Sequence, residues 1–519
     1  MIPSQDSASV CILFKPRTQP DEDLARILAR ELRTRGHHVS LDERTTAGLA
    51  WAEQLAARIQ KADLVIPLVS VRSAESEMLA YEVELVIQAA HEQGGSPELM
   101  PVRLCFSGPL PDQLGNLLQP SEFAWDDETD RYRSHRVLWN SPADDVALID
   151  LICKRISAIK SERKGGNSPA QFDASARSQS IPLDPVGGAM SVESKYYIVR
   201  PTDPEFHSAI HRGDSLVLVK GARQMGKTSL LGRAVQQARE AGVNVVLTDF
   251  QKLQARHFES IKDFYIGLCD LIGGQLRIES PAPERWEKSQ NVNRIFEEFW
   301  RHEVFGGKDR PVLWVCDEFD RLFTTSFGTE VCGLLRSWHN ERALDSSGPW
   351  RFLTIAIAYA TEAHLFINDL NQSPFNVGTR VTLNDFSRGE TSELNGLYRS
   401  PLKNDGELDR FHHLLGGQPY LTQLGLRELA ARNAGIQWLE DQAHLEETIF
   451  SDHLLRLLAV LNQDEKMMKA IRPLARNGTQ VPADIFYRLR SAGVIAGNTS
   501  DQVRLRCGLY QQFLARHLS

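Results

Sequence analysis

The sequence predicts an α/β protein built on parallel β-sheets, and two observations carry this prediction. Short apolar runs alternate with amphipathic helical segments in the N-terminal third of the chain and again in its centre. This alternation is typical of parallel sheets that are covered by helices on both faces. In addition, a glycine-rich loop follows one apolar run and opens a helix within residues 217–231. After residue 386 the pattern turns helical, which predicts smaller helical domains beyond the sheets.

The composition is that of an ordinary soluble protein with several domains. At about 100–200 residues per domain, 519 residues predict three or four domains. A net charge of −8 argues against a general nucleic-acid binder. The seven cysteines are dispersed without CxxC pairs, which favours reduced thiols and a cytoplasmic location. We expect neither a signal peptide nor membrane association, because no apolar stretch approaches the roughly 18 residues of a membrane span.

Strands and helices alternate in the prediction for the N-terminal unit, residues 1–160. The predicted strands are apolar runs at 9–14, 37–43, 63–70 and 99–106. The predicted helices have apolar residues at helical spacing, at 21–36, 49–62, 76–94 and 141–160. Gly36 is expected to end the first helix, and Ser141 with Pro142 to begin the last one.

A segment rich in Ser, Gly, Pro and Ala, residues 161–194, is predicted to be a flexible linker. The central unit after it repeats the alternation of strands and helices. Its predicted strands lie at 214–221, 244–250, 310–320 and 351–362. Helices are predicted beyond it at 392–402, 408–417 and 419–435, and a hairpin at 493–507.

The central unit contains a phosphate loop. The pattern G-x-x-x-x-G-K-[ST] is fitted in full by Gly221, Gly226, Lys227 and Thr228, and Ser229 continues the same turn. Backbone N–H groups at the start of a helix attract anionic phosphate. Lys227 is predicted to hold the β- and γ-phosphates, and Thr228 to ligate Mg²⁺. These residues are the candidate site for ATP or ADP.

An acidic pair follows the apolar run of "PVLWVCDEFD". The run predicts a buried strand, so Asp317 and Glu318 emerge at its carboxyl end. Asp317 suits the Mg²⁺ shell, and Glu318 suits the orientation of a hydrolytic water. Taken alone such a pair also fits a helix cap, but the phosphate loop favours the catalytic interpretation.

Six stretches together resemble the AAA-like family of bacterial STAND-type signalling ATPases: "KYYIVRPTDPEF", "KGARQMGKTSLL", "LWVCDEFDRLF", "NQSPFNVG", "GGQPYLTQLGL" and "FSDHLLRLL". The resemblance covers about residues 180–519. It implies an ATPase core at 195–386, a helical lid at 387–458 and a winged helix at 459–519. It also implies a monomer that holds ADP and that forms a homo-oligomer, a ring or filament, on exchange for ATP.

The same resemblance implies further nucleotide contacts. Ile198 and Arg200 lie in a segment that is similar to the adenine-side motif. Pro419 falls in a lid motif, over the base, and Thr361 occupies the sensor position for the γ-phosphate. The choice of an arginine that acts in trans stays open among Arg321, Arg336 and Arg380.

The N-terminal unit resembles a TIR domain over about residues 8–160. The stretches "SEMLAYEVELVIQAA" and "VSLDERTTAGLAWAEQLAARI" carry this resemblance. It implies that Glu82 is a catalytic carboxylate. The implied NAD⁺-binding residues are Phe14, Arg44, Trp51 and Ser76.

The chemistry implied by the TIR resemblance is cleavage of NAD⁺ at the nicotinamide–ribose bond. Nicotinamide leaves a cationic group as a neutral molecule, so no acid is needed to protonate it. One carboxylate can hold the ribose hydroxyls and stabilise the oxocarbenium-like transition state. The alternative for Glu82 is a solvated glutamate on a helix.

Two other function classes stay open. The TIR domain could act as a scaffold that only recruits partners. Residues 460–519 carry nine Lys or Arg against four acidic residues, and a basic winged helix can bind DNA. We favour instead a winged helix that packs on the nucleotide. The overall expectation is an NLR-like antiphage protein, whose trigger is a phage component or a partner protein.

Overall fold

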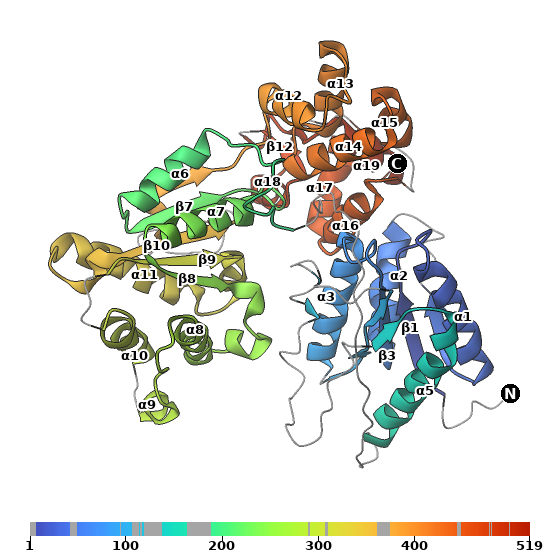
Figure 1. Ribbon diagram of the computed structural model, residues 1–519, viewed down its shortest axis with the longest axis horizontal. Helices are drawn as coiled ribbons and strands as arrows, with labels where there is room; N and C mark the ends of the chain where they lie inside the picture. Colours follow the sequence, from blue (N-terminus) through green and yellow to red (C-terminus); the bar gives the residue numbers. More distant parts are fainter. Residues whose placement is uncertain are drawn as a thin grey trace. The chain divides into compact units, whose positions relative to one another are not determined.

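The computed structural model divides the chain into two compact units, and each contains a parallel sheet (Figure 1). Unit 1 comprises Met1–Gly188, Leu445–Met468 and Arg516–Ser519, and unit 2 comprises Ala189–His444 and Lys469–Ala515. The structure describes residues 7–518, except 42–48, 94, 106–109, 111–113, 115–116, 119–136, 163–187, 289–290, 307–309, 361–373, 444–447, 477, 479 and 498.

The sheet of unit 1 has the strand order β2-β1-β3-β5-β6, with β4 paired to β3, and every pairing is parallel. This is the doubly wound order of flavodoxin-like folds. The predicted α/β class is therefore confirmed for this unit. The strands are β1 (Ser9–Leu13), β2 (His38–Leu41), β3 (Leu64–Val69), β4 (Glu98–Leu99), β5 (Val102–Leu104) and β6 (Val137–Trp139).

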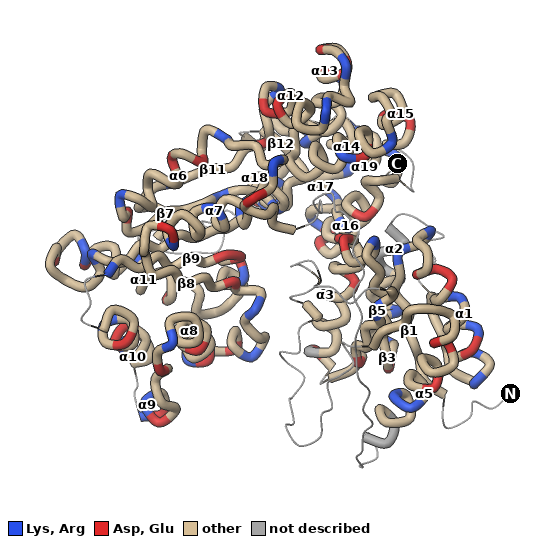
Figure 2. Tube along the Cα trace, viewed as in Figure 1, with Lys and Arg blue, Asp and Glu red and all other residues tan. Residues whose placement is uncertain are grey.

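The helices of unit 1 lie where the sequence pattern predicts them, at α1 (Asp21–Thr34), α2 (Leu49–Gln60), α3 (Glu77–Glu92) and α5 (Asp145–Glu162). α1 has charged residues of both signs along its length, whereas its leucines face the core (Figure 2). Gly36 follows α1 with φ of 88°, a left-handed conformation that favours glycine. Ser141 and Asp144 form the capping box that precedes α5.

Unit 1 also contains a helix from a distant part of the sequence. α16 (Ser451–Asn462) packs against α2 and α3. Leu455 and Ala459 of α16 belong to the same buried apolar cluster as Met78 and Leu79 of α3. The chain therefore leaves unit 2, adds α16 to unit 1 and returns to unit 2, with the boundary inside α17 (Glu465–Ala475).

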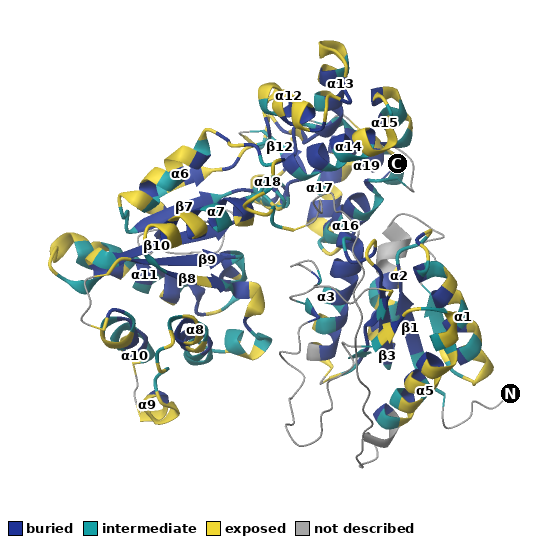
Figure 3. Ribbon diagram, in the orientation of Figure 1, coloured by how far each residue is buried: buried dark blue, intermediate teal, exposed yellow. Residues whose placement is uncertain are grey.

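The sheet of unit 2 has the strand order β11-β7-β10-β9-β8, and all pairings are parallel. The central strands β7, β9 and β10 are buried along most of their length, whereas β11 has one buried residue (Figure 3). The strands of this sheet are β7 (Leu216–Lys220), β8 (Asn244–Asp249), β9 (Val312–Asp317), β10 (Leu353–Tyr359) and β11 (Thr379–Thr382). The sequence pattern predicts four of them, but misses β11, whose short stretch TRVT has little apolar content.

Helices cover this sheet, and aromatic rings dominate one of its two cores. The helices are α6 (Thr202–His211), α7 (Lys227–Glu240), α8 (Ile261–Leu276), α9 (Pro283–Lys288), α10 (Val292–Glu298) and α11 (Gly328–Leu344). Trp300, Trp314, Trp338 and Trp350 pack together in that core. No helix in the described part of either unit is long and apolar enough to cross a membrane.

The C-terminal part of unit 2 is helical, as predicted, with α12 (Arg388–Leu397), α13 (Asp405–Leu415), α14 (Pro419–Arg432), α15 (Ile436–Ala443), α18 (Ala483–Ser491) and α19 (Gly508–His517). The predicted hairpin is present as antiparallel β12 (Ile495–Ala496) and β13 (Arg504–Leu505). The predicted linker lies largely outside the described residues. The boundaries expected at residues 160, 194, 386 and 458 stay predictions.

Candidate functional site

The phosphate loop joins β7 to α7 and is held in a compact turn. Gly226 has φ of 88°, and an added Cβ would lie 2.8 Å from Nη2 of Arg200. Lys227 is the first residue of α7 and is buried. Its Nζ donates to the carbonyl oxygens of Gly221, at 2.9 Å, and Ala222, at 3.1 Å. The loop carbonyls thus hold the ammonium group of Lys227 at the N-terminus of α7, where backbone N–H groups attract anionic phosphate.

Thr228 and Asp317 meet at the carboxyl ends of β7 and β9. Thr228 Oγ1 donates a hydrogen bond of 2.7 Å to Asp317 Oδ2. Glu318 follows in a left-handed conformation, with φ of 51° and ψ of 40°, which ends the strand sharply. The structure therefore brings together residues that are far apart in the sequence.

Burial governs the titration of this acidic pair. It raises the pKa of Asp317, and the hydrogen bond from Thr228 opposes that rise. Burial also raises the pKa of Glu318, whereas the positive charge of Lys227 lowers it. Buried carboxylates of this kind are typical of functional sites, because a nearby cation can stabilise their charged form.

The donor set fits Mg²⁺. A hydroxyl and a carboxylate are hard oxygen ligands, and Mg²⁺ in nucleotide sites takes one or two protein ligands besides phosphates and water. Among the described residues no cluster of three or more His, Cys, Asp or Glu could hold a metal by itself. Thr228 and Asp317 are therefore suited to a metal that arrives with a nucleotide.

β10 lies between the phosphate-loop strand and the acidic strand. Asp320, just after the acidic pair, accepts a 2.7 Å hydrogen bond from the backbone N–H of Ala360 at the end of β10. This bond joins the segment that follows β9 to the segment that follows β10. Thr361, the predicted γ-phosphate sensor, lies outside the described residues.

The segment before α6 reaches the phosphate loop through Arg200. This arginine is buried, and its Nη2 donates to the carbonyl of Met225 at 2.7 Å. Ile198 is also buried, two positions earlier. Ser229 accepts a 2.9 Å hydrogen bond from the backbone N–H of Met190. These contacts place the predicted adenine-side segment beside the phosphate loop.

The same segment also contacts the C-terminal helices. Gln423 of α14 donates to the carbonyl of Tyr196 at 3.0 Å. Pro419 is buried and is the first residue of α14, after a tight turn at Gly417. Gly417 has φ of 70°, and an added Cβ would lie 2.1 Å from the carbonyl oxygen of Phe386. The residues predicted to hold the nucleotide thus come from the core and from α14.

Sequence reasoning missed a buried arginine near this site. Arg506 lies after β13, and its Nη2 is 2.7 Å from the sulfur of Met225 in the phosphate loop. It forms an ion pair with Asp385. Asp385 holds the pKa of Arg506 above its usual value although burial opposes this. In the sequence Arg506 is one basic residue among several, and no motif distinguishes it.

One candidate trans-acting arginine is engaged within unit 2. Arg321 donates to the carbonyl oxygens of Phe250 at 2.7 Å and Leu253 at 3.1 Å. Its guanidinium also lies 4.3 Å from the ring centre of Phe258. These contacts explain Arg321 as a structural residue of its own subunit. Arg380 on β11 is exposed.

In the TIR-like unit, the candidate catalytic residue is enclosed. Glu82 on α3 has no exposed surface. Ser76 is buried too, and its Oγ accepts a 3.2 Å hydrogen bond from the N–H of Leu79, so it caps α3. Phe14 is buried after β1. Arg44 and the side chain of Trp51 lie outside the described residues, so the structure does not place the predicted NAD⁺ pocket as a whole.

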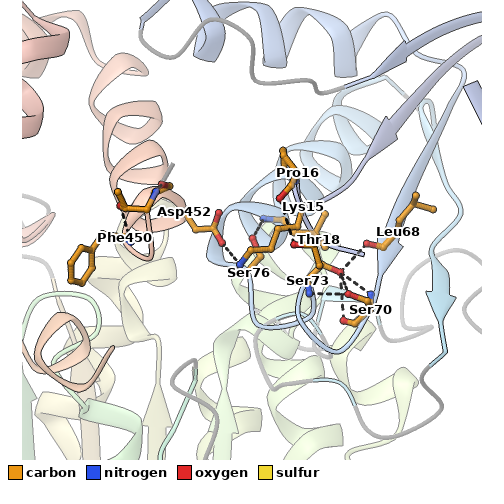
Figure 4. Close-up of polar contacts among 12 residues, drawn as sticks. Lys15, Pro16, Thr18, Leu68, Ser70, Ser73, Ser76, Phe450 and Asp452 are labelled. Carbon is orange, nitrogen blue, oxygen red and sulfur yellow. Dashed lines mark hydrogen bonds and ion pairs between the residues drawn. The ribbon is translucent and has the colours of Figure 1, made fainter. Parts of the chain in front are cut away.

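A buried polar cluster lies at the carboxyl end of β3 (Figure 4). Ser73 Oγ donates to the carbonyl of Leu68 at 3.1 Å and lies 3.2 Å from Ser70 Oγ. Asp21, at the start of α1, is fully buried, and this burial raises its pKa. The nearby hydroxyls of Ser73 and Ser70 and the charge of Lys15 lower this pKa and so oppose the effect of burial.

Comparison with known proteins finds proteins that are similar to part of this chain. An uncharacterized WD repeat-containing protein of Synechocystis sp. is 29% identical over 254 residues, which span 47% of this chain and 21% of that protein. The chain thus spans about a fifth of the length of that relative. A Walker-type ATPase of Pyrococcus abyssi is 17% identical with a TM-score of 0.43, covering 62% of this chain and 96% of that one. The ORC2 protein of Aeropyrum pernix is 12% identical with a TM-score of 0.37, covering 63% and 96%.

Family models match most of the chain. A TIR domain model matches residues 10–135, which include β1 to β5 and α3. An AAA-like domain model matches residues 186–516, which include the phosphate loop, the acidic pair and the C-terminal helices. This second match covers more than half of the sequence. The chain therefore belongs to the AAA-like domain family and carries a TIR domain ahead of its nucleotide-binding site.

Proposed function

We propose that this protein is a nucleotide-switched defence ATPase of the STAND type, whose TIR domain cleaves NAD⁺ once the chains assemble with ATP. The observation that carries the proposal is the 2.7 Å bond between Thr228 and Asp317, in a chain that also has a TIR domain. The bond joins the phosphate loop to the acidic strand, as a nucleotide-dependent switch requires. The proposed location is the cytoplasm.

In the ATPase site, each residue has a proposed role. Lys227 binds the β- and γ-phosphates, and its ammonium can leave the two carbonyl oxygens that it contacts here. Mg²⁺ would neutralise phosphate charge, held by Thr228 and Asp317. Glu318 orients the attacking water. Burial raises the pKa of Glu318, which makes its carboxylate a stronger base than an exposed glutamate.

In the TIR site, Glu82 is the proposed catalytic carboxylate. The bond between ribose and nicotinamide breaks, and the electron pair leaves with neutral nicotinamide. The oxygen of a water molecule then bonds to the anomeric carbon of the ribose and releases one proton to solvent. Glu82 holds the ribose hydroxyls and stabilises the positive charge that develops on the sugar. Because Glu82 is fully buried here, this step requires another arrangement of α3 and its neighbours.

The test measures particle size and nicotinamide release together. Purified protein is loaded with ADP or with a slowly hydrolysed ATP analogue, and size is measured by light scattering after gel filtration. Each pool is then assayed with NAD⁺. We expect a monomer without activity in ADP, and a larger particle that releases nicotinamide in the analogue. Assembly without nicotinamide release would favour the scaffold function.

DNA binding is a second candidate, favoured by exposed basic residues at the C-terminal end of the chain. These residues are Lys466, Lys469, Arg472, Arg476, Arg488, Arg504 and Arg516. Arg506 is excluded from this set, because it is buried and paired with Asp385. Duplex binding that falls steeply with salt would support this function. Binding that is weak at all salt concentrations would exclude it.

A further inference from the structure

We propose that α16 is an intramolecular clasp on the TIR domain, which keeps α3 closed until nucleotide exchange in unit 2 withdraws it. This inference rests on the proposed function, because it names the contact through which the nucleotide switch reaches the TIR domain. The inference starts from α16, because the family to which its sequence belongs differs from the unit in which it packs. Residues 451–462 fall inside the AAA-like match, yet α16 packs in the unit that holds the TIR sheet.

The clasp has an apolar centre. Leu455 and Ala459, one turn apart on α16, are 5% and 3% exposed, and they join the buried cluster of Met78, Leu79 and Tyr81 on α3. Residues at this spacing share one face of a helix. Withdrawal of α16 would therefore expose a continuous apolar surface on the TIR domain. Such a surface is suited to contact another protein.

Charged side chains surround this apolar centre and fix the position of α16. Lys15, which follows β1, forms an ion pair with Asp452 in which its Nζ donates a 2.9 Å hydrogen bond to Oδ2, and Figure 4 shows the two side chains facing each other. Arg456 lies 3.5 Å from Glu77, the first residue of α3, and both side chains are largely buried. Gln463 donates a 3.0 Å hydrogen bond to the hydroxyl of Tyr81.

These contacts converge on the helix that carries the proposed catalytic residue. Glu77 directly follows Ser76, and Tyr81 directly precedes Glu82. Arg456 of α16 pairs with Glu77, and Gln463, directly after α16, donates to Tyr81. Glu82 has no exposed surface while α16 is in place. A substrate can meet this carboxylate only when α3 becomes accessible, so release of α16 and exposure of the TIR site are linked.

The chain also provides a means of withdrawal. α16 is connected to unit 2 at both ends, because the chain enters unit 1 after His444 and returns at Lys469. A rearrangement of the helices in unit 2 therefore acts on α16 through the covalent chain. No separate ligand for the clasp is needed.

The test reverses the buried ion pair in the full-length protein. Arg456→Glu places like charges on α16 and α3, and Glu77→Arg in the same chain restores an attractive pair with the charges exchanged. Lys61→Glu makes the same change of charge at an exposed residue that follows α2 and serves as the control. Hydrogen exchange is measured on peptides that cover α3 and α16, with ADP and with the ATP analogue.

We expect Arg456→Glu to raise exchange in residues 77–83 about tenfold to a hundredfold with ADP, because a broken buried pair destabilises strongly. The double variant and Lys61→Glu should match the wild type. The ATP analogue should raise the same peptides in the wild type. Unchanged α3 exchange in Arg456→Glu, no recovery in the double variant, or no response to the analogue would overturn the clasp.

Nicotinamide release is recorded on the same samples and decides a separate question. Release by Arg456→Glu without ATP supports both the clasp and NAD⁺ cleavage. Raised α3 exchange without release in any sample leaves the clasp intact and counts against NAD⁺ cleavage alone. Release by the wild type with the analogue, but not by Arg456→Glu with the analogue, would show that this pair supports activity rather than restrains it, and would overturn the clasp as the controlling contact.

Discussion

The two candidate sites of this chain differ in how they are held. In the nucleotide site the predicted residues contact one another directly, as Thr228 does with Asp317 and Arg200 with the phosphate loop. In the TIR site the predicted residues contact other groups: Ser76 caps its own helix, and Glu77 beside it pairs with Arg456 from a distant part of the chain. One site is assembled, and the other is enclosed. This difference supports the proposal in which the nucleotide site is the control and the TIR site is the controlled output.

The largest effect is expected for a variant of Lys227 in the nucleotide site. Lys227→Ala removes the buried ammonium of an assembled site and leaves the phosphates without their cation, so we expect nucleotide affinity to fall by more than about a thousandfold. Titration with a fluorescent ADP analogue measures this. Lys252→Ala, at an exposed lysine, is the control. Near-normal affinity in Lys227→Ala would mean that the loop does not bind nucleotide through this residue.

Substitution of two glutamates on α3 tests the TIR site. Glu82→Gln keeps the shape of the side chain but removes its charge, so nicotinamide release by the assembled protein should fall on the order of 10²–10³-fold. Glu84→Gln, at a partly exposed position of α3, should retain activity. Equal activity of Glu82→Gln and the wild type would remove Glu82 from catalysis.

A smaller effect is expected at the C-terminal edge of the nucleotide site. Arg506→Met leaves the carboxylate of Asp385 without its cation, which should destabilise the β12–β13 region by about 3 kcal/mol. Hydrogen exchange of residues 494–507 measures this loss. Addition of Asp385→Asn should recover much of it, and Arg504→Met at an exposed neighbour should have little effect. Equal exchange in Arg506→Met and Arg504→Met would contradict a structural role for the pair.

The smallest expected effect concerns Asp21 and pH. Burial raises its folded-state pKa above the ordinary value of 3.8, so the folded TIR unit binds this proton more tightly than the unfolded chain. Stability from Asp21 is therefore greatest at low pH and is lost as pH rises through the raised pKa. Asp21→Asn should be more stable than the wild type at pH 7, on the order of 1 kcal/mol or about 2–4 °C in melting temperature. The difference should vanish below about pH 4, and a variant that is less stable at pH 7 would contradict this sign.

Local patterns predicted the fold well. Apolar runs located β1, β3, β7, β9 and β10, because a strand that is buried on both faces needs a continuous apolar stretch. Gly36 and Ser141 marked helix ends, since their roles depend on backbone conformation within a few residues. β11 escaped prediction because its place is set by pairing with β7 rather than by its own residues.

In the candidate sites, as in the fold, local motifs could be predicted from the sequence, whereas long-range contacts could not. The phosphate loop and Asp317 follow from local motifs, and the sheet then brings them together. Arg506 and Arg456 could not be predicted, because each acquires its role from a partner far away in the sequence. An isolated arginine carries no signal of such a partner.

The position of α16 has a consequence for how such chains can change. An effector domain that is joined only by a linker can be exchanged for another by recombination at that linker. Here the TIR domain is bound to the rest of the chain at a second place, through Lys15, Glu77 and Tyr81 on one side and Asp452, Arg456 and Gln463 on the other. A replacement effector would have to match that helix or be left without its restraint. The two halves of the contact are therefore expected to change together, although hundreds of residues of sequence separate them.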